Sequence, residues 1–464
     1  MSRARWILAV CLVLWGSSAP MFAAEAQEPT ERELKLEKMV QDLLQRVDDL
    51  EKKLEEGKSE TAVIKETVEK SVEEKKGKPT DAKGYWKGGL NFESADGAHK
   101  LKIGGRVQSD WYAGSVDNGD FQDGTTFRRV WLKILGKVYD DFDFKLQYGL
   151  ENDGVTRWKD LYFDYTGLDF TQIRFGYYKE PFSMEELMFN GDLTFLERAP
   201  LNALVSPSRS TGIMFHNGVL DNRMTWEAGV FKRTNAFGNG WESDGSAGDW
   251  DITARLTGLP WYEDNGEKLL HLGAAYSHKE WGGDALRYNS RGSYYNTGAN
   301  TTLVDTAGIN ADAVDMIGAE LAMVYGPFTL SSEYVHSEVD AVAADSPSFD
   351  SYYVQASYFL TGESRPYKLG EGMWTQVKPK NNFSLKNGGW GAWEVAARYT
   401  NLDLSDTPVA TAIGGDMDDY ALALNWYLNP FTRVMWDYVH SESDDTAGVD
   451  QDADIFMMRL QLDF

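Results

Sequence analysis

Six basic residues occupy two neighbouring segments of this 464-residue chain at even spacings. They are Lys100, Lys102, Arg106, Arg129, Lys133 and Lys137. Side chains an even number of positions apart point to the same face of a β-strand. Two adjacent strands would therefore present one basic surface, and both the forked donors of arginine and the point charge of lysine bind oxyanions. The pattern indicates anion binding by electrostatic attraction.

The positions between these basic residues are largely apolar, so both segments are predicted to be amphipathic strands. The same alternation runs to the end of the chain, where Phe456, Leu460 and Phe464 share one face and Arg459 and Asp463 share the other. A soluble edge strand would show this alternation too. A final aromatic residue on such a strand, however, resembles the assembly signal of bacterial outer-membrane β-barrels, and we favour that interpretation.

About sixteen short amphipathic segments, separated by turns, make up the chain after residue 84. Short and long connections alternate, as in barrels with periplasmic turns and extracellular loops, except that the long connection 361–391 lies on the short-turn side. The predicted strands centre on Ile103, Trp131, Leu146, Tyr162, Ile173, Met214, Trp226, Ala254, Leu272, Leu321, Tyr334, Val354, Val395, Leu424, Val434 and Leu460.

The composition agrees with strands that cross a membrane. Aromatic residues make up 13% of the chain, yet the mean hydropathy is only −0.45. No segment reaches the run of about 18 apolar residues that a membrane-spanning helix needs. The predicted fold class is therefore all-β, a transmembrane antiparallel β-barrel over residues 85–464, preceded by an N-terminal periplasmic α-helical coiled-coil segment.

Residues 1–26 have the features of a secretory signal peptide. Arg3 and Arg5 precede an apolar stretch, and small alanines follow it. The single cysteine of the chain, Cys11, lies in this segment. The mature protein is therefore expected to lack disulfide bonds and cysteine metal sites.

Residues 27–84 are predicted to form a periplasmic helix and a linker. From Glu31 to Leu54, apolar residues recur alternately four and three positions apart, which is the seam of a coiled coil. A solvated single helix or a disordered linker is the alternative. The seam residues are Leu36, Val40, Leu43, Val47, Leu50 and Leu54.

If the apolar face of each strand meets lipid, the other face lines the lumen. This phase turns the six basic residues and Arg174 inward. Strict alternation places Arg128 on the lipid side, unless alternation fails near the loop end of its strand. The third long connection, 180–209, is too apolar for a solvated loop, so it is predicted to fold inward and narrow the pore, with Arg198 and Arg209 near the constriction.

Acidic residues of the same connection, Glu185, Glu186 and Asp192, would compete with those arginines for any anion. The alternative for every inward arginine is a purely structural pairing with an acid. The net charge of −26 excludes nucleic acid as a partner. The acids cluster in the long loops, where they either keep the loops solvated or bind divalent cations.

The six histidines lie on scattered strands or turns and form no catalytic signature. The sequence has no metal-ligand spacing and no glycine loop for phosphates, so no metal or cofactor is expected. An outer-membrane enzyme is therefore the less favoured hypothesis.

Several motifs together resemble the phosphate-selective porin O and P family over about residues 90–464. The resemblance implies a sixteen-stranded trimeric barrel with an inward-folded third loop and an arginine-lined anion path. It also implies that Arg106, Arg128, Arg129 and Arg198 contact anions or form the constriction. The matching motifs are Gly104-Gly105-Arg106-Val107-Gln108, Phe127-Arg128-Arg129, Gly136-Lys137-Val138-Tyr139-Asp140-Asp141-Phe142, Phe195-Leu196-Glu197-Arg198, Leu360-Thr361-Gly362-Glu363-Ser364-Arg365, Gly389-Trp390-Gly391-Ala392-Trp393-Glu394 and Arg398-Tyr399.

The sequence thus predicts a porin in the outer membrane of a Gram-negative bacterium, through which small solutes diffuse passively, with a preference for phosphate or similar anions. The substrate-contacting residues are predicted to be Arg106, Arg128, Arg129, Lys133, Arg198, Lys102 and Arg174. The expected partners are outer-membrane lipids and lipopolysaccharide, small anions, and two further copies of the chain in a homotrimer. The alternative is a general or cation-tolerant porin whose coiled coil tethers the outer membrane to peptidoglycan or another periplasmic partner.

Deleting residues 31–76 separates transport from tethering. Because the deletion spares every predicted barrel strand, we expect the single-channel conductance to be unchanged. The tether hypothesis predicts in addition that the outer membrane detaches from the cell wall, which electron microscopy of the envelope measures. Unaltered attachment would count against the tether.

Overall fold

The computed structural model divides the chain into two units, residues 1–76 and 77–464. It describes residues 38–39, 41–49, 52–53, 81–117, 119, 121–150, 156–206, 208–235, 238, 250–295, 302–342, 345–409, 412–444 and 450–464. In the first unit, the described residues are helical and exposed, including Leu43 and Val47 of the predicted seam. The other seam residues and the predicted signal peptide lie outside the described residues, so the coiled coil stays a prediction.

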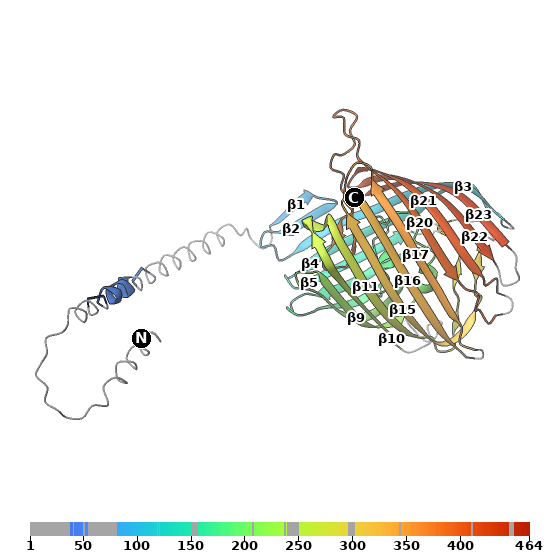
Figure 1. Ribbon diagram of the computed structural model, residues 1–464, viewed down its shortest axis with the longest axis horizontal. Helices are drawn as coiled ribbons and strands as arrows, with labels where there is room; N and C mark the ends of the chain where they lie inside the picture. Colours follow the sequence, from blue (N-terminus) through green and yellow to red (C-terminus); the bar gives the residue numbers. More distant parts are fainter. Residues whose placement is uncertain are drawn as a thin grey trace, which may run out of the picture. The chain divides into compact units, whose positions relative to one another are not determined.

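Sixteen antiparallel strands of the second unit close into a barrel, seen from the side in Figure 1. The barrel closes because the last strand pairs with the first, from Asp463 opposite Arg106 to Ala453 opposite Val116. The strands are β3 (Lys100–Val116), β4 (Gly124–Val138), β5 (Phe142–Leu150), β6 (Thr156–Tyr165), β7 (Gln172–Lys179), β8 (Arg209–Val219), β9 (Met224–Arg233), β10 (Asp251–Glu263), β11 (Lys268–Glu280), β15 (Ile309–Tyr325), β16 (Phe328–Ala341), β17 (Ser348–Phe359), β20 (Ala392–Asp403), β21 (Asp416–Asn429), β22 (Thr432–Asp444) and β23 (Asp450–Asp463). Each contains one of the predicted strand centres, so this part of the prediction is confirmed.

Short elements complete the unit. A hairpin of β1 (Ala82–Trp86) and β2 (Leu90–Ser94) pairs with the start of β3, so the expected boundary at residue 84 falls inside β1. The remaining short elements lie in connections between barrel strands. They are α3 (Met184–Leu187), α4 (Asn202–Val205), η2 (Asp264–Gly266), β12 (Ala285–Leu286), β13 (Asn289–Ser290), β14 (Val304–Asp305), β18 (Tyr367–Lys368) and β19 (Met373–Trp374).

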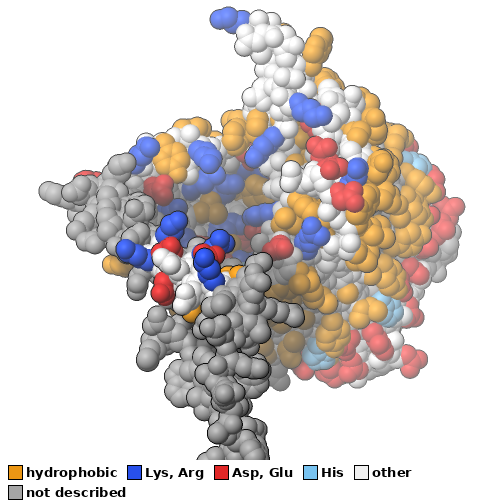
Figure 2. All heavy atoms as spheres, turned by 60° about the vertical axis from the view of Figure 1, so that its left-hand side comes forward, with side chains coloured by type: hydrophobic (Ala, Val, Ile, Leu, Met, Phe, Trp, Pro, Cys, Tyr) orange, Lys and Arg blue, Asp and Glu red, His pale blue; other side chains and the backbone are white. Residues whose placement is uncertain are grey.

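Exposure alternates along the strands as the predicted phase requires. In β23, Phe456 and Leu460 are about half exposed on the outer face, whereas Met457 and Arg459 are buried inside. Figure 2 shows hydrophobic side chains spread over the outer wall of the barrel. This apolar outer face suits the hydrocarbon of a bilayer. Among the described residues, no helix is both long and apolar enough to span a membrane.

One polar arrangement recurs on the outer face of four consecutive hairpins, in the half of each strand nearer the long loops. A tyrosine hydroxyl and the side-chain nitrogen of a His or Asn two residues later both donate to one Asp on the next strand. The sets are Tyr276, His278 and Asp315; Tyr334, His336 and Asp350; Tyr399, Asn401 and Asp418; and Tyr438, His440 and Asp454. The His or Asn lies directly opposite its Asp in all four pairings.

Closure of the barrel leaves no room for a side chain at Gly105 of β3. A Cβ there would lie 2.5 Å from the ring of Phe464 and 2.6 Å from the backbone oxygen of Trp131. At Gly258 of β10, by contrast, a Cβ would meet nothing within 4 Å.

We therefore expect Gly105→Ala to destabilise the barrel by about 1–3 kcal/mol, the usual cost of overpacking. Gly258→Ala is the matched control and should leave the stability unchanged. The measurement is the temperature at which the folded barrel converts to the unfolded form in electrophoresis. Equal transition temperatures for the two variants would contradict the packing argument.

Candidate anion path

The third long loop, which we call L3 (residues 180–208), lies inside the barrel and is almost entirely buried. Arg433 of β22 donates to the backbone carbonyls of Leu193 and Thr194 at 2.7 and 3.0 Å, and Arg459 of β23 donates to that of Leu196 at 2.5 Å. A loop has no neighbouring strand whose N–H groups could donate to its carbonyls, and these charged donors take that role. The inward fold of L3 is thus built by arginines of the wall.

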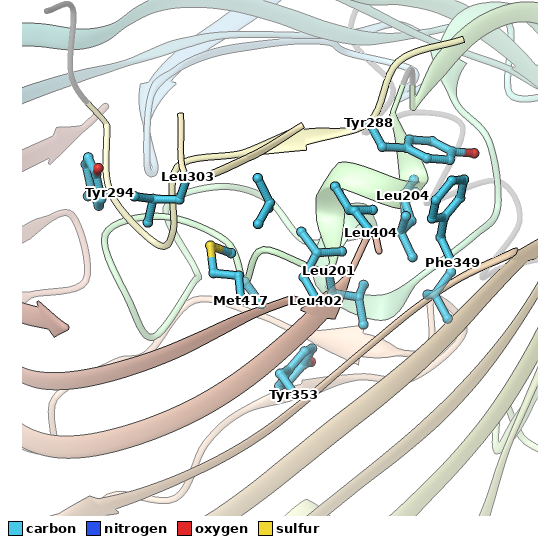
Figure 3. Packing of buried hydrophobic residues seen from close by; sticks show 14 of the residues in the cluster. Leu201, Leu204, Tyr288, Tyr294, Leu303, Phe349, Tyr353, Leu402, Leu404 and Met417 are labelled. Atoms are coloured by element: carbon cyan, nitrogen blue, oxygen red, sulfur yellow. The ribbon is translucent and has the colours of Figure 1, made fainter. Parts of the chain in front are cut away.

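Apolar packing holds the other side of L3. Figure 3 shows Leu201 and Leu204 of L3 packed against Leu402, Met417 and Phe349 of the wall. Side chains from the connection between β11 and β15, such as Leu303, join the same cluster. This core fills part of the lumen at the long-loop end of the barrel, so the apolar residues of L3 have a packing role.

The long connection 361–391 supports L3 from the opposite end. Arg365 pairs with Glu394 of β20 at 2.6 Å and donates to the carbonyl of Asp192 at 3.1 Å. Trp374 of β19 packs in one cluster with Met184 and Met188 of L3. The connection that broke the predicted alternation of short and long turns therefore folds back into the barrel.

A cavity of about 820 Å³ opens between L3, this connection and strands β3–β9. Figure 2 shows a hollow on the side of the molecule that it presents, with Lys and Arg side chains gathered in it. Nine lining residues are basic: Lys100, Lys102, Lys133, Lys137, Lys145, Arg174, Lys179, Arg209 and Lys368. Six are acidic: Asp143, Asp160, Asp164, Asp192, Glu227 and Glu371. The excess is cationic in a chain whose total charge is strongly negative.

Two of the predicted site residues, Lys102 and Lys133, line this cavity with no ion-pair or hydrogen-bond partner in the part of the chain that the structure describes. The Lys133 ammonium lies 4.4 Å from the ring centre of Phe189, at the tip of L3. Arg174 also lines the cavity, but its Nε and one of its two terminal nitrogens bind Asp164 at 2.8 Å. Of the predicted site residues that line the cavity, the two lysines are therefore the ones that present a positive charge to the lumen without a counter-ion.

Arg106 lies behind Phe189. Its guanidinium is 1% exposed, stacks 3.9 Å from the Phe189 ring centre and binds Asp463 at 2.5 and 2.8 Å. The loop comes so close here that a Cβ on Gly191 would overlap the guanidinium. Arg106 thus joins the closing strand β23 to L3.

Arg128 and Arg129 both bind the Glu197 carboxylate of L3, although they are sequence neighbours. A register shift between β3 and β4 explains this: Gln108 pairs with Arg129 and Ser109 with Phe127, which leaves Arg128 without a partner in the ladder. Such a bulge re-aims a side chain. The prediction that strict alternation puts Arg128 toward lipid is wrong, and the exception foreseen for the loop end of the strand applies.

Arg198 points into L3 itself. It donates to the carbonyls of Glu185, Glu186 and Met188 at 2.9 to 3.0 Å and pairs with the Glu186 carboxylate. Burial would raise the pKa of Glu186, but the charges of Arg198 and Lys179 lower it to about 2. The structure thus places Arg198 as a brace of the loop. The same pairing with acids holds for Arg106, Arg128, Arg129 and Arg174.

Sequence reasoning missed the role of Glu197 and the contribution of Lys179 and Lys368 to the cavity. Glu197 lies in one of the motifs that carry the family resemblance, next to the predicted site residue Arg198. Lys368 lies in the connection 361–391, whose length on the short-turn side was the signal that this segment does more than reverse the chain.

Comparison with known proteins gives a consistent result. The family model "Phosphate-selective porin O and P" matches residues 101–464. Porin O of Pseudomonas aeruginosa is 28% identical over 417 residues, which cover 82% of this chain and 91% of the relative. An uncharacterized protein of Caulobacter vibrioides is 29% identical over 74% of this chain and 68% of its own length.

Solved structures with a similar fold include the outer membrane channel DcaP of Acinetobacter baumannii. It has 10% sequence identity and a TM-score of 0.49, and the match covers 80% of this chain and 99% of that one. An anion-selective porin from Comamonas acidovorans has 13% identity and a TM-score of 0.48, over 79% of this chain and all of that one.

Asp192 gives the cavity a pH-dependent charge. Burial raises the pKa of this carboxyl to about 6, and the nearby Arg106 offsets only part of the effect. Asp192 is thus negative at pH 7.5 and neutral at pH 5, so acidification makes the lumen more positive. We expect anion selectivity, measured from the reversal potential in a potassium chloride gradient, to rise as the pH falls through about 6. In Asp192→Asn most of this rise should disappear; a wild-type pH profile in that variant would contradict the assignment.

Proposed function

The chain belongs to the phosphate-selective porin O and P family and is an outer-membrane porin of a Gram-negative bacterium; on that premise we propose how it selects its solutes. Small anions diffuse passively through the cavity beneath L3 and are favoured there over cations. The pore acts by electrostatic focusing and partial dehydration, with no covalent step.

The observation that carries this proposal is the pair of unpaired cations, Lys102 and Lys133, in a cavity wall with nine basic and six acidic residues. A charge that already has a neighbouring counter-ion exerts little field on a passing ion. An unpaired ammonium in a lumen walled by protein exerts a larger one, because less water screens it than at an open surface.

The paired arginines support the same function in a different way. Arg106, Arg129 and Arg198 fix the position of L3 and hence the width of the passage. Arg128 and Arg174 keep side-chain exposures of 19% and 22%, so their remaining donors can still face a solute. In this proposal the arginines shape the passage and the lysines supply most of its field.

The small oxyanions, phosphate among them, fit this chemistry best, because ammonium and guanidinium groups both donate to oxygen. The name of the family supports the same solute class. We further propose that the chain forms a homotrimer embedded in outer-membrane lipid and lipopolysaccharide, and that residues 1–26 are a signal peptide.

A second candidate function rests on the N-terminal unit. Its described residues form an exposed helix with Leu43 and Val47 on the predicted seam. A coiled coil built on that seam would be compatible with both transport and attachment of the outer membrane to the cell wall.

Lys133→Ala tests the proposed selectivity. Removing an unpaired charge at a few ångströms from the ion path costs a passing anion about 1 kcal/mol, so we expect the anion-to-cation permeability ratio to fall about fivefold. Lys268→Ala removes the same charge from a turn where Lys268 pairs with Asp264, and it should leave the ratio unchanged. Reversal potentials in an asymmetric potassium chloride gradient measure both. A cation-selective wild-type channel would overturn the proposal itself.

A further inference from the structure

Three guanidinium groups converge on the single carboxylate of Glu197. Arg128 binds it through two nitrogens at 3.0 and 3.2 Å, Arg129 through two at 3.0 and 3.4 Å and Arg459 through one at 2.7 Å. Burial of Glu197 would raise the pKa of its carboxyl, but the charges of Arg128 and Arg129 hold that pKa well below the usual range. The three arginines therefore favour the charged form of Glu197.

The stoichiometry differs from that of one-to-one pairs elsewhere in the wall. Arg174 of β7 has Asp164 of β6, and Arg106 of β3 has Asp463 of β23, so each of these arginines has its own acid on the neighbouring strand. In the cluster at Glu197, Arg459 also has its own wall acid, Asp110, which it binds at 2.6 and 2.7 Å. Arg128 and Arg129 have ion pairs only with Glu197 among the described residues. Three positive and two negative charges leave the cluster with a surplus of one.

The negative partner comes from the loop and not from the wall. Glu197 belongs to L3. Arg128 and Arg129 belong to β4 and Arg459 belongs to β23, and both strands are part of the barrel wall. The side chains of Glu197 and Arg128 are 12% and 19% exposed, more than those of Arg129 and Arg459 at 6% and 1%, so solvent reaches the cluster from the side of Arg128. On the inward face of β4, the cluster lies nearer the long loops than Trp131 and Lys133, which line the cavity. This level of the wall lies between the long loops and the residues of β4 that line the cavity.

The geometry matches that of a bound oxyanion. Two carboxylate oxygens accept from forked donors of several arginines, which is how proteins hold phosphate or sulfate. The ring of Tyr295 lies 3.9 Å from the Arg128 guanidinium and fixes its plane. Glu197 thus fills the position in which three arginines would otherwise bind a free anion.

We propose that Glu197 is a specificity-determining residue of the pore: a tethered counter-anion that competes with permeating oxyanions for Arg128 and Arg129 and so keeps them from being retained. This inference rests on the proposed anion selectivity. A channel must bind its ion well enough to admit it and weakly enough to release it. Without the tethered carboxylate, the cluster would carry a larger surplus of positive charge at one level and would bind multivalent anions as a trap.

Glu197→Gln tests the proposal in the full-length channel, because glutamine keeps the shape and removes the charge. We expect the phosphate concentration that halves the chloride current to fall about tenfold. The matched control is Glu363→Gln, which makes the same change at a buried carboxylate that binds Thr361 and the backbone of Lys380 instead of an arginine. It should leave the phosphate block at the wild-type value. An unchanged block in Glu197→Gln would overturn the proposal.

Arg128→Gln provides a second test if Glu197→Gln does not fold. The proposal predicts that this change, which brings the net charge of the cluster to zero, lowers the anion-to-cation permeability ratio and weakens the phosphate block. A purely structural role for the Arg128–Glu197 pair predicts lower thermal stability with unchanged selectivity, and that result would overturn the proposal. A different result would contradict the proposed function, namely a preference of the wild-type channel for cations.

Discussion

The structure depends on one constraint: a loop inside a barrel has backbone carbonyls that no strand can satisfy. Along L3, guanidinium groups from the wall meet this need, as in the bonds from Arg433 to Thr194 and from Arg459 to Leu196. A buried polar group without a partner would cost about 1–3 kcal/mol each. The arginines therefore stabilise a loop path that would otherwise be unfavourable. The width of the pore follows from that path.

This constraint explains why most inward arginines are paired. A buried guanidinium without a counter-ion is strongly destabilising, so most arginines that reach L3 are accompanied by an acid, as Arg106 is by Asp463 and Arg365 by Glu394. The pairing removes these charges from the field that a solute experiences. Cations that are not needed for packing, Lys102 and Lys133 above all, remain available to attract anions. Structure and selectivity thus use different members of one basic set.

The sequence was enough to predict the wall and the inward path of L3, but not the side-chain contacts of the interior. Period-two alternation located all sixteen strands, because each strand has one face that must be apolar and one that must not. It failed at Arg128, where a bulge inserts a residue and no composition signal marks it. It also could not show that Glu197, 68 residues from Arg129, would lie on that arginine's guanidinium. Such contacts depend on the path of L3 in three dimensions, which alternation does not encode.

The repeated set of Tyr, His or Asn, and Asp on the outer wall makes four strand pairs of this barrel self-sufficient in their polar contacts. Four successive hairpins carry the set in the same pairing, although Asn401 replaces histidine in one of them. Each of these hairpins contains both the donors and the acceptor of its set, because the Asp lies on the second strand of the same pair. The set therefore forms wherever the two strands pair in register and does not depend on the neighbouring hairpin.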